Sequence, residues 1–446
     1  MSPSSASSRG AGRPRPAPAP ESGPPHRLWS RGFLLFFTAR AVAVLGDAML
    51  PVALSAGLLR HGMGAGDIGL AMASFTVCLA GFVVFGGVLS DRFDARRLMV
   101  GSDLVRMCTQ ALVAVLFLTG HVVLWQLCAI GAVNGVAAGL FQPGVASTVP
   151  KVARDVQGAN GMIRTAESLA MLAGPALAGV LVAVASPGGV FLAHAGTYAL
   201  SALCLVLLRL PRTPQGPPPA AAGGWAAAYR ADLAEGWREF RSRTWMWGVI
   251  VLWMVLMITV TGPLVPLTAT EIISGHDART YGLVSSALGA GTAVGGLLAL
   301  RIRPLHPLRA GALALLGYGL YPASVGAQLT PAAIAVCTAA SGAAIGFWGV
   351  MWATSVQTQV PGPVRGRVHA YEVAGSLAMM PVGQALAGPA AELLGARTVL
   401  VAGGAAALAV SLSLLSVPAI RNLRRAGSRD PSGSRSASGP AAENRV

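Results

Sequence analysis

The sequence predicts an all-α integral membrane protein whose twelve transmembrane helices form two parallel-repeat halves of six helices each. Three observations predict this class. Of the 446 residues, 54% are hydrophobic and only 11% are charged, which is too apolar for a soluble globular enzyme. The apolar residues fall into twelve runs of span length. Finally, features of the first half recur in the second, as described below.

Hydropathy and turn residues place the spans in order along the chain. We predict them at 32–59, 67–90, 98–120, 122–146, 159–186, 189–209, 245–271, 280–300, 308–328, 331–357, 368–394 and 397–419. The chain then divides into a disordered head (1–30), an N-terminal half (31–210), a linker (211–244), a C-terminal half (245–420) and a disordered tail (421–446). Within the linker, residues 229–240 have the mixed-charge pattern of an interfacial amphipathic helix.

The basic residues are distributed as topology signals. The segments that would face the cytoplasm with the N-terminus inside hold 27 of the 33 Lys and Arg residues, whereas the opposite loops hold only Arg60, Arg279 and Arg397. This bias predicts that both termini are cytoplasmic. Because the basic residues lie in short loops between apolar runs, the net charge of +16 does not indicate nucleic acid. We expect a multi-pass protein of a bacterial inner membrane.

An internal repeat relates the two halves at an offset of 208 to 209 residues. Gly86–Phe93 aligns with Gly295–Ile302, and Ser168–Met171 aligns with Ser376–Met379. Six spans per half give both halves the same orientation, so the repeat axis lies along the membrane normal. Such a repeat predicts a binding site between the halves, near the middle of the membrane.

The loop after the second predicted span carries a recognisable motif, GVLSDRFDARR, from Gly87 to Arg97. This motif resembles the major facilitator superfamily, and its form is similar to the drug:proton antiporter branch that contains macrolide-efflux-type exporters. The resemblance covers roughly residues 30 to 420, with Gly174-Pro175 as a further match. It implies the major facilitator fold and a transporter that couples cargo to an ion gradient.

The resemblance implies a latch that holds the two halves together on the cytoplasmic side. Gly87 allows two helices to approach closely, and Asp91 accepts hydrogen bonds from a facing helix. The remaining motif residues are Arg92, Arg96 and Arg97, and the partners in the other half would be Arg365 and Arg367. The alternative is that these arginines serve only as topology charges.

The fifth predicted span carries the small residues of an antiporter-like signature, namely Gly161, Gly174, Pro175 and Gly179. Small residues on one face permit close packing against the other half, and Pro175 leaves the carbonyl of Met171 without its helical donor. Ordinary helix packing explains the same pattern. The arginine that many drug antiporters carry in the fourth span is absent, since Gly131 lies near that position.

Charged residues inside spans are costly and mark candidate ion pathways. Asp47, near the middle of the first span and four residues before Pro51, is the first candidate for proton coupling; Glu167 and Glu372 follow. Arg40 is a candidate partner for Asp47, in a pair that is either functional or structural. Two couples at a spacing of three residues can neutralise themselves along one helix, namely Asp103 with Arg106 and Arg164 with Glu167.

Aromatic side chains in the spans are candidates for lining a cargo cavity, although packing is their commoner role. These are Phe141, Trp253, Trp348 and Trp352. None of the seven histidines pairs at a metal-binding spacing, and His194 is expected to be an ordinary core residue. The five cysteines form no CxxC pair. We therefore expect no metal and no cofactor.

The function that fits best is secondary active export of an amphipathic organic compound by alternating access, driven by protons. The only lysine, Lys151, follows Pro150 rather than a glycine-rich loop, so no ATP-binding P-loop is present. Translocation of lipid or lysolipid, and import of a small molecule, are alternatives with the same fold. A non-transporting receptor is an alternative of another class. The expected partners are a small amphipathic substrate, protons and the lipid bilayer, and the chain is expected to be a monomer and not an enzyme.

Overall fold

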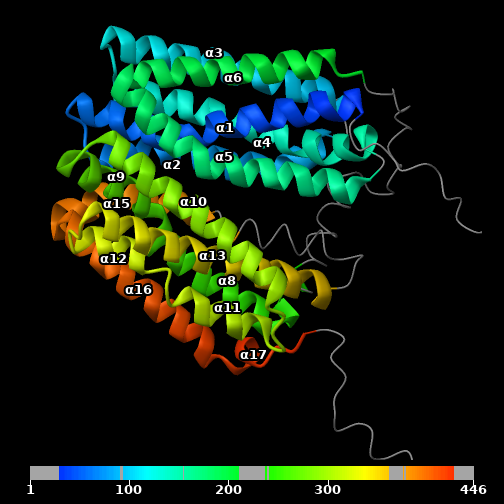
Figure 1. Cartoon of the computed structure of the whole chain (residues 1–446), viewed down its shortest axis with the longest axis vertical. Helices are drawn as coiled ribbons and strands as arrows, with labels where there is room; N and C mark the ends of the chain where they lie inside the picture. Colours follow the sequence, from blue (N-terminus) through cyan, green and yellow to red (C-terminus); the bar gives the residue numbers. More distant parts are fainter. Residues whose placement is uncertain are drawn as a thin grey trace, which may run out of the picture.

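A computed structural model describes residues 30–90, 94–153, 155–209, 237–238, 241–360, 375 and 378–425. These residues form a helical bundle (Figure 1). The N-terminal helices are α1 (Arg31–Arg60), α2 (Ala65–Ser90), α3 (Ala95–Thr119), α4 (Leu124–Val152), α5 (Val156–Val184) and α6 (Pro187–Leu207). The C-terminal elements are α8 (Thr244–Leu256), the π-helical turn η1 (Met257–Thr261), α9 (Gly262–Gly275), α10 (Ala278–Arg301), α11 (Pro307–Leu315), α12 (Leu320–Gly326), α13 (Pro331–Gln359), α15 (Met380–Leu394), α16 (Ala396–Ser416) and α17 (Pro418–Arg421).

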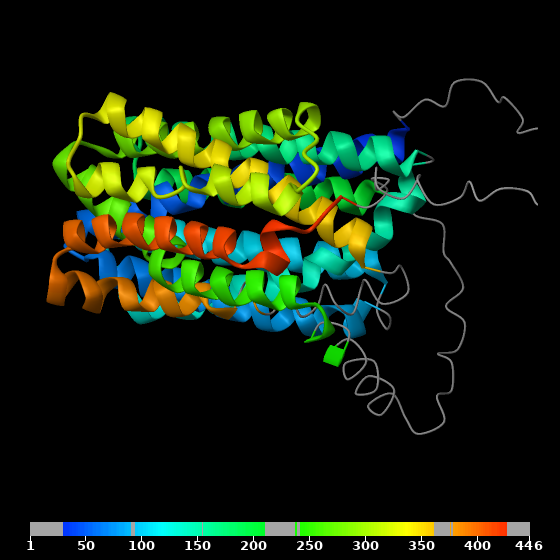
Figure 2. The same cartoon turned by 90° about the horizontal axis from the view of Figure 1, so that it is seen from below.

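The two halves use the same packing scheme. In the first half α2 packs on α4, α3 on α6, and α1 on α5; in the second, α10 packs on α13, α11 and α12 on α16, and α9 on α15. All these helices run along a common direction, as Figure 2 shows. The fold class predicted from the sequence is confirmed.

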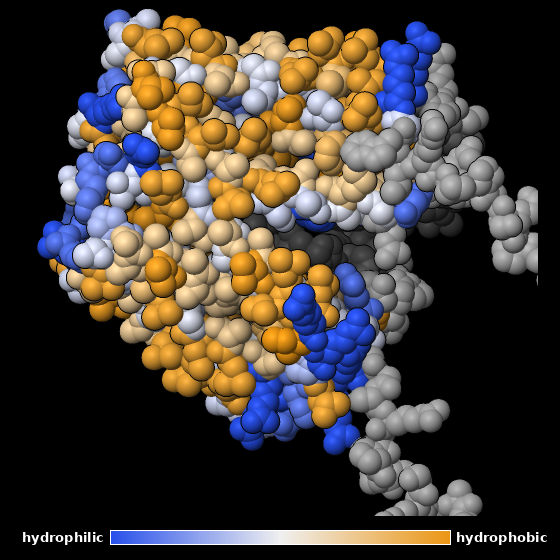
Figure 3. Space-filling view, in the orientation of Figure 1, coloured by the Kyte–Doolittle hydropathy of each residue, from blue (hydrophilic) through white to orange (hydrophobic). Residues whose placement is uncertain are grey.

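Ten helical segments of the described residues are long and apolar enough to cross a membrane. The first six predicted spans correspond to α1–α6, the seventh to the continuous segment Thr244–Gly275, and the eighth, tenth and twelfth to α10, α13 and α16. The ninth span is divided into α11 and α12. Of the eleventh, the structure describes residue 375 and residues 378–394, which include α15. In Figure 3 apolar residues cover the sides of the bundle, which suits contact with lipid.

The break in the ninth span has a local cause. Pro322 has no N–H, so the carbonyl of Tyr318 lacks the donor of a continuous helix. Ser341 of α13 replaces that donor, with its hydroxyl 2.9 Å from the Tyr318 oxygen, and it accepts a hydrogen bond from the Tyr321 N–H at 3.0 Å. The division of this span was not predicted, since hydropathy does not detect a turn that a neighbouring helix satisfies.

The two halves meet at one end of the bundle. We call the end that carries the loop residues Arg60, Arg279 and Arg397 the outer end, after the charge-based prediction, and the opposite end the inner end. Toward the outer end α5 packs on α10 and α2 on α15. The backbones touch there, because a Cβ atom on Gly282 would lie only 2.4 Å from the Pro175 oxygen. Toward the inner end the halves diverge (Figure 1), and the surface between them is hollowed (Figure 3).

Candidate functional site

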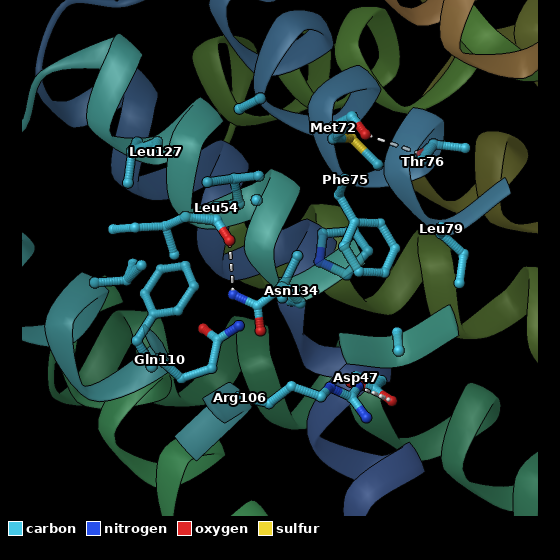
Figure 4. Close-up of a pocket in the computed structure, with 18 of the residues that line it drawn as sticks. Asp47, Leu54, Met72, Phe75, Thr76, Leu79, Arg106, Gln110, Leu127 and Asn134 are labelled. Carbon is cyan, nitrogen blue, oxygen red and sulfur yellow. Dashed lines mark hydrogen bonds and ion pairs between the residues drawn. The ribbon is translucent and has the colours of Figure 1, made fainter. Parts of the chain in front are cut away.

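A cavity of about 360 Å³ lies among the helices of the first half and is bordered by α15 of the second. Helices α1, α2, α3, α4 and α6 line it from the first half, and α15 contributes Met380 and Gln384 from the second. Most of its surface is apolar, including Leu54, Phe75 and Leu127, and its volume falls in the range of small-molecule sites. Figure 4 shows the polar side chains that interrupt this apolar wall, and these are the groups able to do chemistry.

Asp47 of α1 and Arg106 of α3 form an ion pair in the cavity wall (Figure 4). Arg106 Nη2 lies 2.8 Å from one carboxylate oxygen and 3.0 Å from the other. The arginine side chain is only 6% exposed, whereas that of Asp47 is 39% exposed. The carboxylate is therefore the more accessible member of the pair.

Helix α6 completes the surroundings of Asp47. Tyr198 donates a hydrogen bond from its hydroxyl to Asp47 Oδ1, and the Arg106 guanidinium lies 4.1 Å from the centre of the Tyr198 ring. His194 is buried, with Nε2 3.3 Å from Asp47 Oδ1. Gly46 makes this approach feasible, because a Cβ atom there would lie 2.3 Å from the His194 ring. One carboxylate thus joins three helices.

Asp103 lies deeper in the same region and is 0% exposed. Its Oδ2 accepts a hydrogen bond of 2.5 Å from Ser201 of α6, and its Oδ1 has no hydrogen-bond partner among the described residues. The predicted ion pair between Asp103 and Arg106 is wrong, because Arg106 forms its ion pair with Asp47 instead. The two residues are neighbours along α3, but the guanidinium extends across to α1.

A second charged group joins α1 to α5. Arg40 donates to Glu167 Oε1 from Nη2 at 2.8 Å and from Nε at 3.1 Å, and Arg164 donates to Glu167 Oε2 at 3.0 Å. The predicted couple of Arg164 and Glu167 is confirmed, whereas the predicted pairing of Arg40 with Asp47 is wrong. Since both oxygens of Glu167 are engaged by guanidiniums, this carboxylate is less available than Asp47.

The latch residues of the motif have different positions. Asp91, Arg92, Arg365, Arg367 and the third coupling candidate Glu372 lie outside the described residues, and Gly87 is part of α2. Arg96 donates to the carbonyls of Leu205, at 2.9 Å, and of Val206, so it binds the C-terminal end of α6 within its own half. Arg97 is exposed. The role of a latch between the halves stays a prediction.

The small residues of α5 do not share one contact. Gly179 and Pro175 face α10, where a Cβ on Gly179 would lie 2.8 Å from the Ala278 oxygen. Gly174 instead packs on Ala48 of α1, and a Cβ on Gly161 would meet nothing within 4 Å. In addition, the Ala176 N–H donates to Ser286 of α10 at 3.0 Å. Within the predicted signature, the residues toward the outer end, Pro175 and Gly179, are therefore the ones that pack closely against the other half.

The aromatic candidates separate into two groups. Phe141 lines the cavity described above, with the Arg40 guanidinium 6.0 Å from its ring centre. The tryptophans line a smaller cavity of about 180 Å³ within the second half. There Trp348 is stacked between Trp253 and Trp352, at centroid distances of 5.8 and 6.3 Å. Packing is thus the main role of Trp348, which is buried.

Sequence reasoning missed the polar residues that complete the site. On α6 these are His194, Tyr198 and Ser201, and on α3 Gln110 joins Asp103 and Arg106. The sequence did contain a signal, because the members of each set are spaced three and four residues apart and so lie on one face of their helix. Polar residues on one face of an otherwise apolar span indicate that this face is turned away from lipid.

A helical membrane bundle of two similar halves, with charged side chains in a cavity inside the bundle, is the architecture of a secondary transporter. The model of the Major Facilitator Superfamily matches residues 36–380. The chain belongs to this superfamily, and it is a transporter and not an enzyme.

Relatives and solved structures agree with this assignment. The chain is 27% identical to an uncharacterized MFS-type transporter, YfiS, of Bacillus subtilis over 89% of its length and 95% of the relative. It is 20% identical to macrolide efflux protein A of Streptococcus pyogenes, over 89% and 98%, and 25% identical to the multidrug efflux pump Tap of Mycolicibacterium fortuitum, over 87% and 96%. The structure of the nucleoside transporter NupG superimposes with a TM-score of 0.68 at 12% identity, over 86% of this chain and 98% of NupG. This last likeness concerns the fold.

Proposed function

We propose that the chain exports an amphipathic organic compound across a bacterial inner membrane by alternating access, and that protons flowing inward drive the export. Two relatives are named as efflux proteins, which favours export over import. The observation that carries the proton coupling is the Asp47–Arg106 pair, in which the carboxylate is the exposed member. Both termini are cytoplasmic in this proposal.

The geometry of Asp47 suggests how a proton acts. As a carboxylate, Asp47 holds Arg106 and Tyr198 through charge-assisted hydrogen bonds, which are stronger than neutral ones. A proton on Asp47 removes the negative charge and one acceptor site, so α1 is held less firmly to α3 and α6. Because the protonated and ionised forms favour different contacts, protonation shifts the balance between two arrangements of the helices.

The observed arrangement corresponds to one end state of the cycle. The halves touch at the outer end and diverge toward the inner end. In the proposed orientation the cavity is then loaded from the cytoplasm. Export requires the opposite arrangement, in which the α5–α10 and α2–α15 contacts separate and the inner ends meet.

The experiment is efflux from a bacterial host that lacks its own pumps. A macrolide, a cationic dye and a lysolipid are tested in cells that carry the wild type, Asp47→Asn, or the control Asp155→Asn, with and without a protonophore. Asp155 caps α5, where its side chain accepts from the Gly158 N–H at 2.9 Å, and asparagine caps equally well. We expect wild-type efflux that collapses with the protonophore, loss of efflux in Asp47→Asn, and normal efflux in the control.

Each other outcome has a definite meaning. Efflux that persists with the protonophore contradicts proton coupling. If Asp47→Asn exports normally, Asp47 is not the coupling residue, and Glu167 and then Glu372 are tested in its place. If the wild type exports no compound of the panel, the export proposal fails and import or lipid translocation takes precedence.

A further inference from the structure

A separate cavity, of about 270 Å³, lies at the inner end of the second half. It is lined by the ends of α10 and α13, by the loop between α10 and α11, and by the segment that follows α17. Three arginines line it, namely Arg303 in the loop and Arg424 and Arg425 after α17, and all three are exposed. None of the described residues that line it is acidic, so its described wall carries only positive charge.

Two contacts of the main chain hold the last two arginines at this cavity. The N–H of Arg425 donates to the Leu305 carbonyl at 2.9 Å, and the Gln359 side chain donates from Nε2 to the Arg424 carbonyl at 2.8 Å. The backbone after α17 is therefore fastened to the loop and to α13, whatever the arginine side chains bind. A topology signal requires only that arginines lie on one side of the membrane. It does not require arginines from distant parts of the chain to converge on one cavity.

Exposed apolar side chains lie beside these charges. Leu300 and Ile302 line the cavity and are 66% and 47% exposed, and Leu305, whose carbonyl holds Arg425, is 66% exposed. Figure 3 shows hydrophilic residues gathered at the inner end of the second half next to apolar ones. On the surface of a membrane protein such apolar side chains contact acyl chains, while arginines reach the headgroups.

A phospholipid fits both features of the cavity, whereas a free phosphate ion fits only one. Guanidinium groups bind phosphate oxygens through paired, charge-assisted hydrogen bonds, and basic pockets between transmembrane helices bind anionic headgroups. An inorganic ligand would leave the exposed apolar residues without a partner.

We propose that this cavity binds the phosphate headgroup of an anionic phospholipid, with Arg303, Arg424 and Arg425 at the headgroup and the acyl chains against Leu300 and Ile302. The site shares no lining residue with the cavity that contains Asp47. It therefore goes beyond the proposed function, since it holds a lipid of the membrane rather than the exported compound.

Native mass spectrometry of the delipidated full-length protein in detergent tests this proposal. Phosphatidylglycerol and phosphatidylcholine with the same acyl chains are titrated separately, and the fraction of protein with bound lipid gives each Kd. We expect the wild type to bind phosphatidylglycerol more tightly than phosphatidylcholine. Because one basic residue near the headgroups contributes about fivefold in affinity, Arg303→Gln and Arg424→Gln each raise the phosphatidylglycerol Kd about fivefold, and the double substitution raises it about 25-fold. Arg303→Lys keeps the charge and is expected to retain most of the binding.

Arg309 provides a matched control. It is exposed near the start of α11, at the same end of the same half, and it does not line the cavity. Arg309→Gln removes the same charge and is expected to leave the phosphatidylglycerol Kd unchanged. Since all the substituted arginines are exposed, the melting temperatures of the variants are expected to match that of the wild type. Weaker binding in the cavity variants then cannot be attributed to unfolding.

Three results would overturn the inference. These are equal Kd values for the two lipids, an equal effect of Arg309→Gln and Arg303→Gln, or displacement of phosphatidylglycerol by inorganic phosphate but not by chloride at the same ionic strength. The first removes the preference for an anionic headgroup, the second attributes it to the overall charge of the inner end, and the third assigns the cavity to a free phosphate ion. None of these measurements depends on export, so the efflux experiment tests the proposed function separately.

Discussion

The contact between Gly282 and Pro175 makes a quantitative prediction about the equilibrium between conformations. Gly282→Ala places a Cβ atom 2.4 Å from the Pro175 carbonyl oxygen and 3.2 Å from the Gly179 Cα. Both neighbours are backbone and do not rotate away. Ordinary van der Waals contact begins at 3.4 Å, so α10 must retreat from α5 by about 1 Å, since overlap of packed atoms is strongly repulsive.

The cost follows from this displacement. A gap of about 1 Å removes roughly a quarter to a half of the dispersion energy of the atoms it separates, and overpacking costs about 1–3 kcal/mol in all. In alternating access this contact exists only while the outer end is closed. The substitution therefore shifts the population toward the opposite arrangement by a factor of about 5 to 150.

Double electron–electron resonance measures this shift. Spin labels at His121 and Leu329, exposed residues in outer loops of the two halves, report the separation of the outer end in a variant without the five native cysteines. We expect Gly282→Ala to add a population at longer distance. Gly296→Ala on the same helix is the control, because its Cβ would meet nothing within 4 Å. If both variants give the wild-type distribution, the reasoning is refuted.

Three further predictions concern single contacts. Ser201→Ala leaves the buried Asp103 carboxylate without its donor and lowers stability by about 1–3 kcal/mol, seen as a lower melting temperature that Ser201→Thr restores. Gly46→Ala pushes the His194 ring away from α1 and costs about 1–3 kcal/mol, so efflux and melting temperature both fall. Asp277→Ala removes the α10 cap and about 1 kcal/mol. Hydrogen bonds from Thr280 lower the pKa of Asp277. The stabilisation by this cap is therefore complete above the ordinary carboxyl pKa and is lost as the pH falls through the lowered pKa of Asp277. Hydrogen exchange of the amides at the start of α10, measured as a function of pH, tests this.

The sequence predicted what depends on neighbours along the chain. Spans follow from runs of apolar residues, and the pairing of Arg164 with Glu167 follows from their spacing on one helix. The pairing of Arg40 with Glu167 joins residues 127 positions apart, and it depends on how α1 is rotated against α5. Periodicity gives the face of a helix but not the helix that it meets, which is why Arg40 was assigned to Asp47.

Gln384 illustrates a second limit. In the sequence it is one amide in an apolar run, and nothing in its neighbours indicates what surrounds it in the fold. Two of its properties follow only from the fold, namely its place in the wall of a cavity built mainly by the other half and the absence of a partner for its buried Oε1 among the described residues. Unsatisfied groups become visible only when all surrounding acceptors and donors are placed.

The two halves share a packing scheme but differ in their chemistry. The first half contains the ion pairs of Asp47 and Glu167 within its helices. In the described part of the second half the acidic residues are Glu271, Asp277 and Glu392, all toward the outer end. In the proposed mechanism a proton on Asp47 changes contacts among α1, α3 and α6, whereas the described part of the second half has no acidic residue at the corresponding depth.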